Sequence, residues 1–140
     1  IDARDYVRMQ VGPDVATGVF ESGHSDEARG KLSAVHFVRF PLPELAGWAK
    51  FPQPASKFAI AGVFVARAAG GVRVAVTGIA PAPLRVRAFE EALARDFRPA
   101  ALEKLSLPPA GLTDNRDASA EYRAHLVAVM ARRAVAAALG

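Results

Sequence analysis

The fold of this 140-residue chain is decided by residues 58–77, which read FAIAGVFVARAAGGVRVAVT. Residues 58–67 are apolar at nearly every position, and residues 72–77 alternate valine with arginine, alanine and threonine. Because strand side chains point alternately to opposite faces, the second run predicts a strand that buries one side, and the first predicts a more central strand. Gly70 and Gly71 between them favour a hairpin turn, since a phosphate-binding loop would lead from a strand into a helix.

The residues before this hairpin predict extended chain. Residues 32–40 alternate with a period of two and are rich in β-branched and aromatic side chains, which indicates a strand that ends at Pro41. Residues 48–51 predict a second short extended segment, because the prolines that follow restrict the preceding residues and leave no room for a helix. Residues 51–58 are therefore expected to form a rigid loop before the hairpin begins.

The residues after the hairpin predict two helices of unequal length. Apolar side chains recur three and four positions apart over residues 86–97, which indicates a short amphipathic helix lying on the sheet. A short turn of helix is expected over residues 100–105. Ser119 is a favourable N-cap and Glu121 suits the positive end of a helix, so the apolar stripe that follows predicts the longest helix.

These elements together predict an α+β fold. We expect an antiparallel sheet of three to four strands with the helices packed on one face. Residues 1–31 have no sustained period of 2 or 3.6, so we expect them to be a connecting segment, and residues 32–140 to be a single α+β domain. The chain begins at Ile1 rather than at a methionine, which indicates a piece of a longer protein.

The composition narrows the classes of function. With 51% hydrophobic and 23% charged residues the chain is typical of one soluble globular domain, and no apolar run predicts a membrane span or a signal peptide. Without cysteine, the chain itself cannot form disulfides, thiolate zinc sites or protein-ligated iron–sulfur clusters. The net charge of +4 comes with no basic block, so we do not expect nucleic-acid binding. In the absence of a targeting signal, cytoplasmic is the default localisation.

Most polar residues of the chain form no pattern typical of catalysis or metal binding. His24, His36 and His125 are far apart, whereas metal-ligand motifs have compact spacing. Residues 22–26 contain serine, histidine and aspartate, but a catalytic triad joins distant segments, so a polar surface turn is expected there. The arginines near the helices are expected to be solvated or paired with acids. We assign no catalytic residue and no metal ligand.

Trp48 and Lys50 stand apart from these residues. They lie two positions apart on an extended segment, so their side chains point the same way and would place an aromatic face beside a cation. Such a pair suits a planar, electron-rich or anionic ring. Composition alone favours the alternative, in which Trp48 packs in the core and Lys50 is an ordinary surface lysine.

Five segments carry a resemblance to one protein family: residues 48–50 (WAK), 54–59 (PASKFA), 73–78 (RVAVTG), 83–85 (PLR, before a helix with Glu90 and Leu93) and 117–126 (DASAEYRAHL). In this order and spacing they resemble the C-terminal domain of the FAD-binding medium subunit of molybdenum hydroxylases. The chain is most similar to the aerobic carbon monoxide dehydrogenase branch and more distantly to xanthine dehydrogenase. The resemblance runs from about residue 17 to residue 137, and the opening of the last helix is its most specific part.

This resemblance implies the fold of the carbon monoxide dehydrogenase flavoprotein C-terminal domain and a role in an oxidoreductase. A complete subunit of this family takes electrons from iron–sulfur clusters in a small subunit, which are fed by a molybdenum cofactor in a large subunit. It passes them through FAD to an acceptor. The glycine-rich segments that hold the FAD pyrophosphate lie in an N-terminal domain of the same subunit, and nothing in this chain matches them. The isolated chain is therefore expected to be inactive.

The resemblance also implies roles for particular residues. Trp48 stands where the family places an aromatic residue, usually tyrosine, near the isoalloxazine, and Lys50 stands where a lysine approaches the flavin. Residues 51–57 correspond to a loop that borders the flavin. In the helices, Tyr122 and Arg123, together with Asp117 before them, are expected to fix the last helix to the sheet.

Two other classes of function stay open at this point. The domain could be a non-catalytic assembly module, with Trp48 in its core and only subunit contacts on its surface. It could also be a basic nucleic-acid binder, although RNA-binding sheets usually expose several stacking aromatics, and the predicted strands are mostly aliphatic.

Overall fold

The structure is a computed structural model that describes the backbone of residues 7–11, 15–24 and 32–140, and the side chains of residues 42–140. The chain divides into two compact units, residues 1–42 and residues 43–140. Each unit has its own antiparallel sheet.

The first unit is a three-stranded antiparallel sheet in the order β1-β2-β3, with strands β1 (Val7–Val11), β2 (Val15–His24) and β3 (Leu32–Pro41). The predicted strand over residues 32–40 is confirmed. Its place in the molecule differs from the expectation, because it pairs along its whole length with β2 and the compact units divide after Leu42.

The stretch that we expected to be a connecting segment, residues 1–31, therefore contains β1 and β2. Its alternation is interrupted by glycine and polar residues, so local sequence does not predict a strand there. The strand forms against a partner, with Val19 opposite Phe37 in the register. Strand formation of this kind depends on cross-strand neighbours more than on intrinsic propensity.

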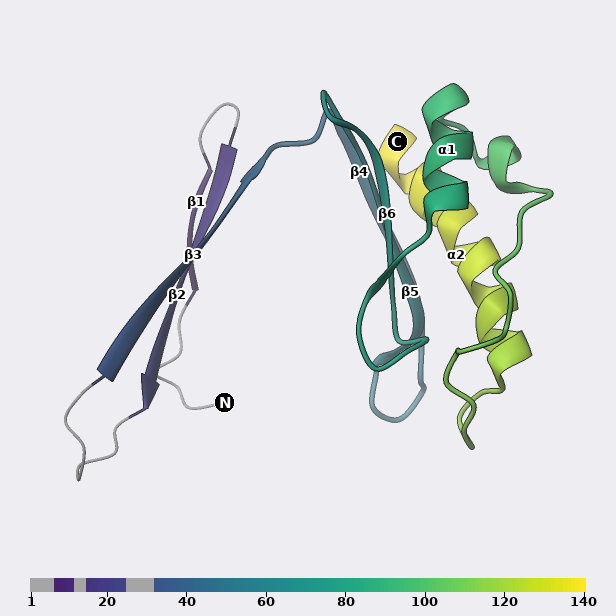
Figure 1. The fold of residues 1–140 in the computed structure, drawn as a ribbon, viewed down its shortest axis with the longest axis horizontal. Coiled ribbons are helices and arrows are strands. Elements are labelled where there is room, and N and C mark those ends of the chain that lie inside the picture. The colour runs from purple at the N-terminus through teal and green to yellow at the C-terminus, as the bar shows by residue number, and fades with distance from the viewer. Residues whose placement is uncertain (1–6, 12–14, 25–31) are drawn as a thin grey trace. The chain divides into compact units, whose positions relative to one another are not determined.

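The second unit is a four-stranded antiparallel sheet in the order β4-β5-β6-β7, covered by helices. Its elements are β4 (Leu45–Pro52), β5 (Ala59–Ala68), β6 (Gly71–Thr77), β7 (Leu84–Arg85), α1 (Arg87–Arg95), the 3-10 helix η1 (Pro99–Leu102) and α2 (Ala120–Leu139). Both α-helices lie on the same side of the sheet (Figure 1). The predicted α+β architecture, with an antiparallel sheet and helices on one face, is confirmed for this unit.

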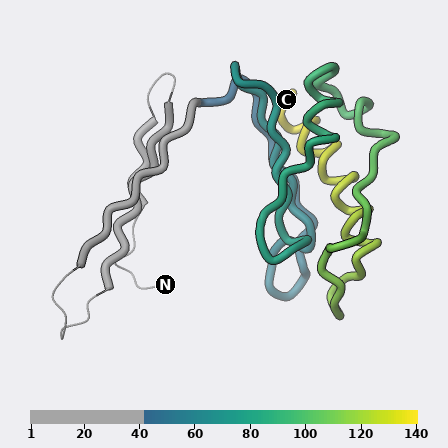
Figure 2. Tube along the Cα trace, in the orientation of Figure 1, coloured from purple at the N-terminus to yellow at the C-terminus, as the bar shows by residue number. Residues whose placement is uncertain are grey.

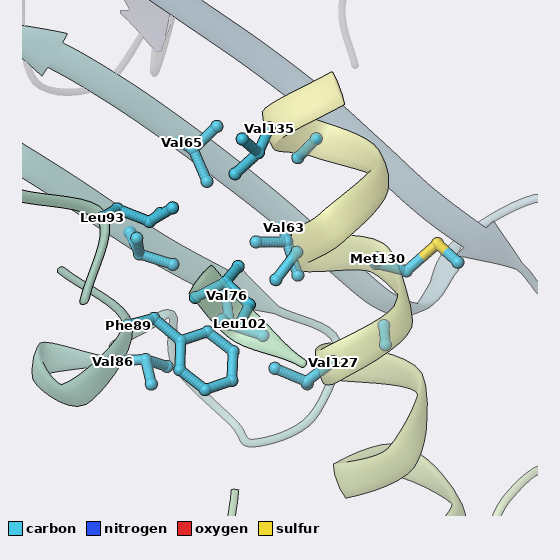
Figure 3. Packing of buried hydrophobic residues seen from close by; sticks show 14 of the residues in the cluster. Val63, Val65, Val76, Val86, Phe89, Leu93, Leu102, Val127, Met130 and Val135 are labelled. Atoms are coloured by element: carbon cyan, nitrogen blue, oxygen red, sulfur yellow. The ribbon is translucent and has the colours of Figure 1, made fainter. Parts of the chain in front are cut away.

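The core of the second unit lies between the sheet and the two helices. Val63 and Val65 of β5 and Val76 of β6 point toward the helices and are fully buried (Figure 3). They meet Phe89 and Leu93 of α1 and an apolar stripe of α2: Val127, Met130 and Val135. Both predictions for the hairpin are confirmed. The second strand, β6, buries only the side that carries its valines, and the first strand, β5, is central because it lies between β4 and β6.

Helix α2 packs closely against β4, although the two elements are far apart in the sequence (Figure 2). A Cβ atom added to Gly47 would overlap the carbonyl oxygen of Ala134 and lie 2.7 Å from the backbone nitrogen of Ala138. Only a residue without a side chain allows this approach. The helix begins as predicted, because the Ser119 hydroxyl accepts a hydrogen bond from the backbone N–H of Tyr122 at 3.2 Å.

Candidate functional site

The side of the sheet that faces away from the helices is the outer face, and it carries both candidate residues. It consists of residues 46, 48 and 50 of β4, 62, 64 and 66 of β5, and 73, 75 and 77 of β6, which alternate with the buried positions. Because directly opposed residues of antiparallel strands share a face, these positions form rows across the sheet. Trp48, Phe64 and Ala75 make the middle row, and Lys50, Gly62 and Thr77 make the next.

Trp48 and Phe64 lie side by side on this face with large exposed areas. The side chain of Trp48 is 46% exposed and that of Phe64 is 40% exposed, whereas the neighbouring residues Val63 and Val65 are fully buried. The interpretation from composition, that Trp48 packs in the core, is therefore wrong. Composition misses this outcome because the face of β4 that the helices cover depends on where α2 packs, close against Gly47.

Lys50 points to the same side as Trp48, as the spacing on an extended segment predicted. Its side chain is exposed, and its ammonium donates a hydrogen bond to the backbone carbonyl of Lys57 at 3.2 Å. This bond holds the ammonium at the end of the face next to the loop that follows β4. The outer face thus offers an aromatic surface with a tethered cation at its edge.

The loop between β4 and β5 is held by its own hydrogen bonds. Gln53 donates its backbone N–H to the carbonyl of Phe58 at 2.8 Å, and its own carbonyl accepts from the N–H of Lys57 at 2.8 Å. The side-chain oxygen of Gln53 accepts from the N–H of Ser56 at 2.6 Å. Lys57 adopts a left-handed conformation with φ of 63°. These contacts agree with the rigid loop predicted from the prolines, although β4 extends through Pro52.

The charge of the outer face is positive. Of the nine outer-face positions in β4, β5 and β6, two are basic, Lys50 and Arg73, and none is acidic. Both basic side chains are exposed. Anionic or electron-rich groups are therefore favoured on this surface over cations.

Two other arginines are occupied by structural contacts. Arg85 forms a two-point ion pair with Glu90, with distances of 3.0 Å and 2.6 Å, and Glu90 also accepts the backbone N–H of Val74 at 3.0 Å. The hydrogen bond from Arg85, with a further contribution from that N–H, holds the pKa of the buried Glu90 carboxyl below its ordinary value. This agrees with the expectation that the arginines near the helices pair with acids.

Arg123 connects α2 to the sheet, as the resemblance implied. It is only 4% exposed, and one guanidinium nitrogen donates to the carbonyls of Ile60 at 2.8 Å and Gly78 at 2.7 Å. Its other terminal nitrogen donates to the side-chain oxygen of Asn115 at 2.8 Å. Sequence reasoning missed Asn115, because no periodicity or motif marks a loop residue that meets a helix eight positions later.

The other residues named with the last helix have lesser roles. The ring of Tyr122 packs edge-on against Phe51, with centroids 6.2 Å apart and an interplanar angle of 87°. The side chain of Asp117 is exposed, and its backbone N–H donates to the side-chain oxygen of Asn115 at 3.1 Å. Tyr122 thus secures the start of α2 against β4, and Asp117 contributes only its backbone.

Of the three histidines, only His125 has a side chain that the structure describes. His125 is exposed on α2, while His24 and His36 lie on β2 and β3, where side chains are outside the described part of the structure. Of residues 22–26, the last two are also outside the described residues. Among the groups that the structure describes, no cluster of three or more histidine, aspartate or glutamate residues could hold a metal ion.

The chain was compared with protein-family models, curated proteins and solved structures, and none of them matches it. Within the described residues, no helix is both long and apolar enough to cross a membrane.

Proposed function

We propose that residues 43–140 are the C-terminal domain of the FAD-containing medium subunit of a molybdenum hydroxylase of the carbon monoxide dehydrogenase type. In this proposal the outer face forms one wall of the flavin site. The observation that carries it is the joint exposure of Trp48 and Lys50 on one face of the sheet, at the positions that the resemblance assigns to flavin contacts. The four-stranded antiparallel sheet with helices on one face is compatible with this assignment.

The chemistry of the face suits an isoalloxazine ring. The indole of Trp48 can pack beside a planar ring system, with the ring of Phe64 extending the apolar surface. The ammonium of Lys50 favours negative charge on the ring, and its tether to the loop carbonyl limits how far it can move. FAD, when bound, supplies the electron transfer, whereas these residues orient the ring and cover one side of it.

The remainder of the flavin site belongs to other parts of the proposed complex. The one Gly-Gly pair of the described second unit lies at the tight turn between β5 and β6, with Gly70 in the turn and Gly71 as the first residue of β6, and does not open a helix. The domain therefore lacks a helix-terminal cradle for the pyrophosphate there, which would supply most charge-assisted hydrogen bonds. The N-terminal FAD-binding domain of the same subunit is the proposed source. The iron–sulfur and molybdenum-cofactor subunits are the proposed partners.

A titration with riboflavin tests this proposal, because riboflavin has the isoalloxazine ring but no pyrophosphate and so does not need the pyrophosphate cradle. The isolated chain should be colourless after purification and should quench riboflavin fluorescence only at high protein concentration. Trp48→Leu should abolish this quenching. Tyr122→Leu is the matched control, because Tyr122 is an aromatic residue of similar exposure that lies on α2. Equal quenching by the wild type and Trp48→Leu would contradict the proposal, and so would a stoichiometric yellow protein.

A non-catalytic assembly module is the second candidate, and the exposure of Phe64 is the observation that favours it. An exposed aromatic pair on a sheet face also suits burial against another protein domain. In that case Trp48→Leu and Phe64→Leu would both weaken assembly with the neighbouring subunits, and neither would change riboflavin quenching.

A further inference from the structure

Gly62 is buried although it lies on the outer face, opposite the exposed Lys50 and two positions from the exposed Phe64. The reason is the side chain of Trp48, which lies over it. A Cβ atom added to Gly62 would be 2.5 Å from Cη2 and 2.9 Å from Cζ2 of the indole. These two atoms belong to the six-membered ring, so the far end of the indole rests on the bare backbone of β5.

The register explains how the indole reaches this position. Trp48 is opposite Phe64, and Gly62 is opposite Lys50 in the adjoining row, so the indole crosses diagonally from its own row to the next. That row consists of Lys50, Gly62 and Thr77, and the glycine leaves a gap between two side chains. A glycine within a strand often marks a place where another group approaches the backbone closely. Here the indole of Trp48 fills the gap above Gly62, in the same row as Lys50.

We propose that Gly62 is a positioning residue for the indole of Trp48. By leaving the backbone bare, it allows the indole to lie low across the sheet, beside Lys50, with its remaining face open to a planar ligand. This inference rests on the proposed function for the identity of that ligand, an isoalloxazine ring. The placement of the indole by Gly62 is independent of the ligand and can be tested alone.

The expected effect of a methyl group at this position follows from what it would touch. The nearest atoms are at the free end of the Trp48 side chain, which can rotate away, and the next is Cγ2 of Thr77 at 3.1 Å. Gly62→Ala should therefore displace the indole and leave the backbone in place. Replacing glycine by alanine also lowers the conformational entropy of the unfolded chain, which favours the folded state of the variant.

Trp48 is the only tryptophan of the chain, so its fluorescence reports this displacement directly. Relative to the wild type, Gly62→Ala should show a red-shifted emission maximum and a larger acrylamide quenching constant, with an unchanged circular dichroism spectrum. Gly70→Ala is the matched control, because a Cβ atom there meets nothing within 4 Å, and it should leave the emission unchanged. Unchanged emission and quenching in folded Gly62→Ala would overturn the inference.

A second variant covers the case in which Gly62→Ala does not fold. Phenylalanine lacks the ring atoms that reach Gly62, so the double variant Trp48→Phe/Gly62→Ala should fold and melt at the temperature of Trp48→Phe. A double variant that also fails to fold would overturn the inference.

Riboflavin then separates the inference from the function on which it rests. A displaced indole together with weaker riboflavin quenching supports both. A displaced indole with unchanged riboflavin quenching supports the role of Gly62 and contradicts the proposed flavin site.

Discussion

The two faces of the β4–β7 sheet each contain a buried glycine, and the two glycines are buried by different kinds of neighbour. Gly47 faces the helices and lies against the backbone of α2, at Ala134 and Ala138. Gly62 faces away from the helices and lies under the side chain of Trp48. One glycine lets two backbones approach, and the other makes room for a side chain.

This difference separates the part of the domain that maintains the fold from the part that is available for binding. A backbone contact between a helix and a strand cannot relax without moving the whole helix, because interiors are close-packed. A surface side chain can rotate away with little effect on stability. Substitutions on the inner side should therefore change the free energy of unfolding, and substitutions on the outer face should change ligand binding.

The largest effect on stability is expected for Arg123→Met. The substitution removes the hydrogen bonds from the guanidinium to the buried carbonyl of Ile60 and to the partly buried carbonyl of Gly78. We expect a loss of about 3–5 kcal/mol in the free energy of unfolding, from two or three such groups. Urea denaturation monitored by circular dichroism measures it. Arg133→Met, at an exposed position of the same helix, should be nearly neutral, and equal effects of both variants would contradict the role of Arg123.

The second largest effect on stability is expected for Gly47→Ala, with a loss of about 3 kcal/mol in the free energy of unfolding. The added methyl group overlaps the backbone of α2 and forces the helix away from β4. The same denaturation experiment on Gly62→Ala should give a change of less than about 1 kcal/mol. Similar losses for the two variants would remove the distinction between the faces.

A smaller, pH-dependent effect is expected for Glu90→Gln. The ion pair with Arg85 lowers the pKa of Glu90 in the folded protein, so this contribution to stability is complete above the ordinary glutamate pKa and is lost as pH falls through the lowered value. At neutral pH the variant should be less stable by about 1–2 kcal/mol. Unfolding measured from pH 7 to pH 3 should show the difference shrinking below about pH 4. A difference that stays constant with pH would contradict this account.

The sequence predicts the second unit well because its signals are local. The valine alternation of β6, the Gly70-Gly71 turn and the Ser119 N-cap each act within a few residues, and the structure confirms all three. The strands before residue 32 were missed because each is defined by a cross-strand partner, β1 by β2 and β2 by β3, and not by a local pattern.

The distinction between local signals and contacts between distant segments also applies to the candidate site. That Trp48 and Lys50 share a side follows from the period of a strand, so the sequence predicted it. Whether that side is covered depends on where α2 packs, which is set by Gly47 and the register of β4 with β5. The role of Gly62 depends on a diagonal contact between strands, and a single sequence contains no signal for such a contact.

The smallest effect, and the one most specific to the outer face, is expected for Lys50→Ala in the FAD-loaded complete subunit. Without the cation, reduction of the flavin becomes harder, so the midpoint potential should fall. A screened charge about 4 Å away is worth about 1 kcal/mol, or about 20 mV for a two-electron couple. Redox titration measures this shift.

Arg73→Ala is the control for this titration, because Arg73 has the same charge on the same face, two rows away from Lys50. At about 13 Å along the strands, its effect is largely screened. Equal shifts, or no shift in either variant, would contradict a contact between Lys50 and the flavin.

The central claim, that the outer face receives a flavin ring, is tested most directly by NMR of the ¹⁵N-labelled chain during a riboflavin titration. Trp48 is the only tryptophan, so its indole N–H gives a single side-chain resonance that needs no further assignment. We predict that this resonance shifts progressively with riboflavin concentration in the wild type and much less in Gly62→Ala. An indole resonance that stays in place while riboflavin is added to the wild type would contradict the claim.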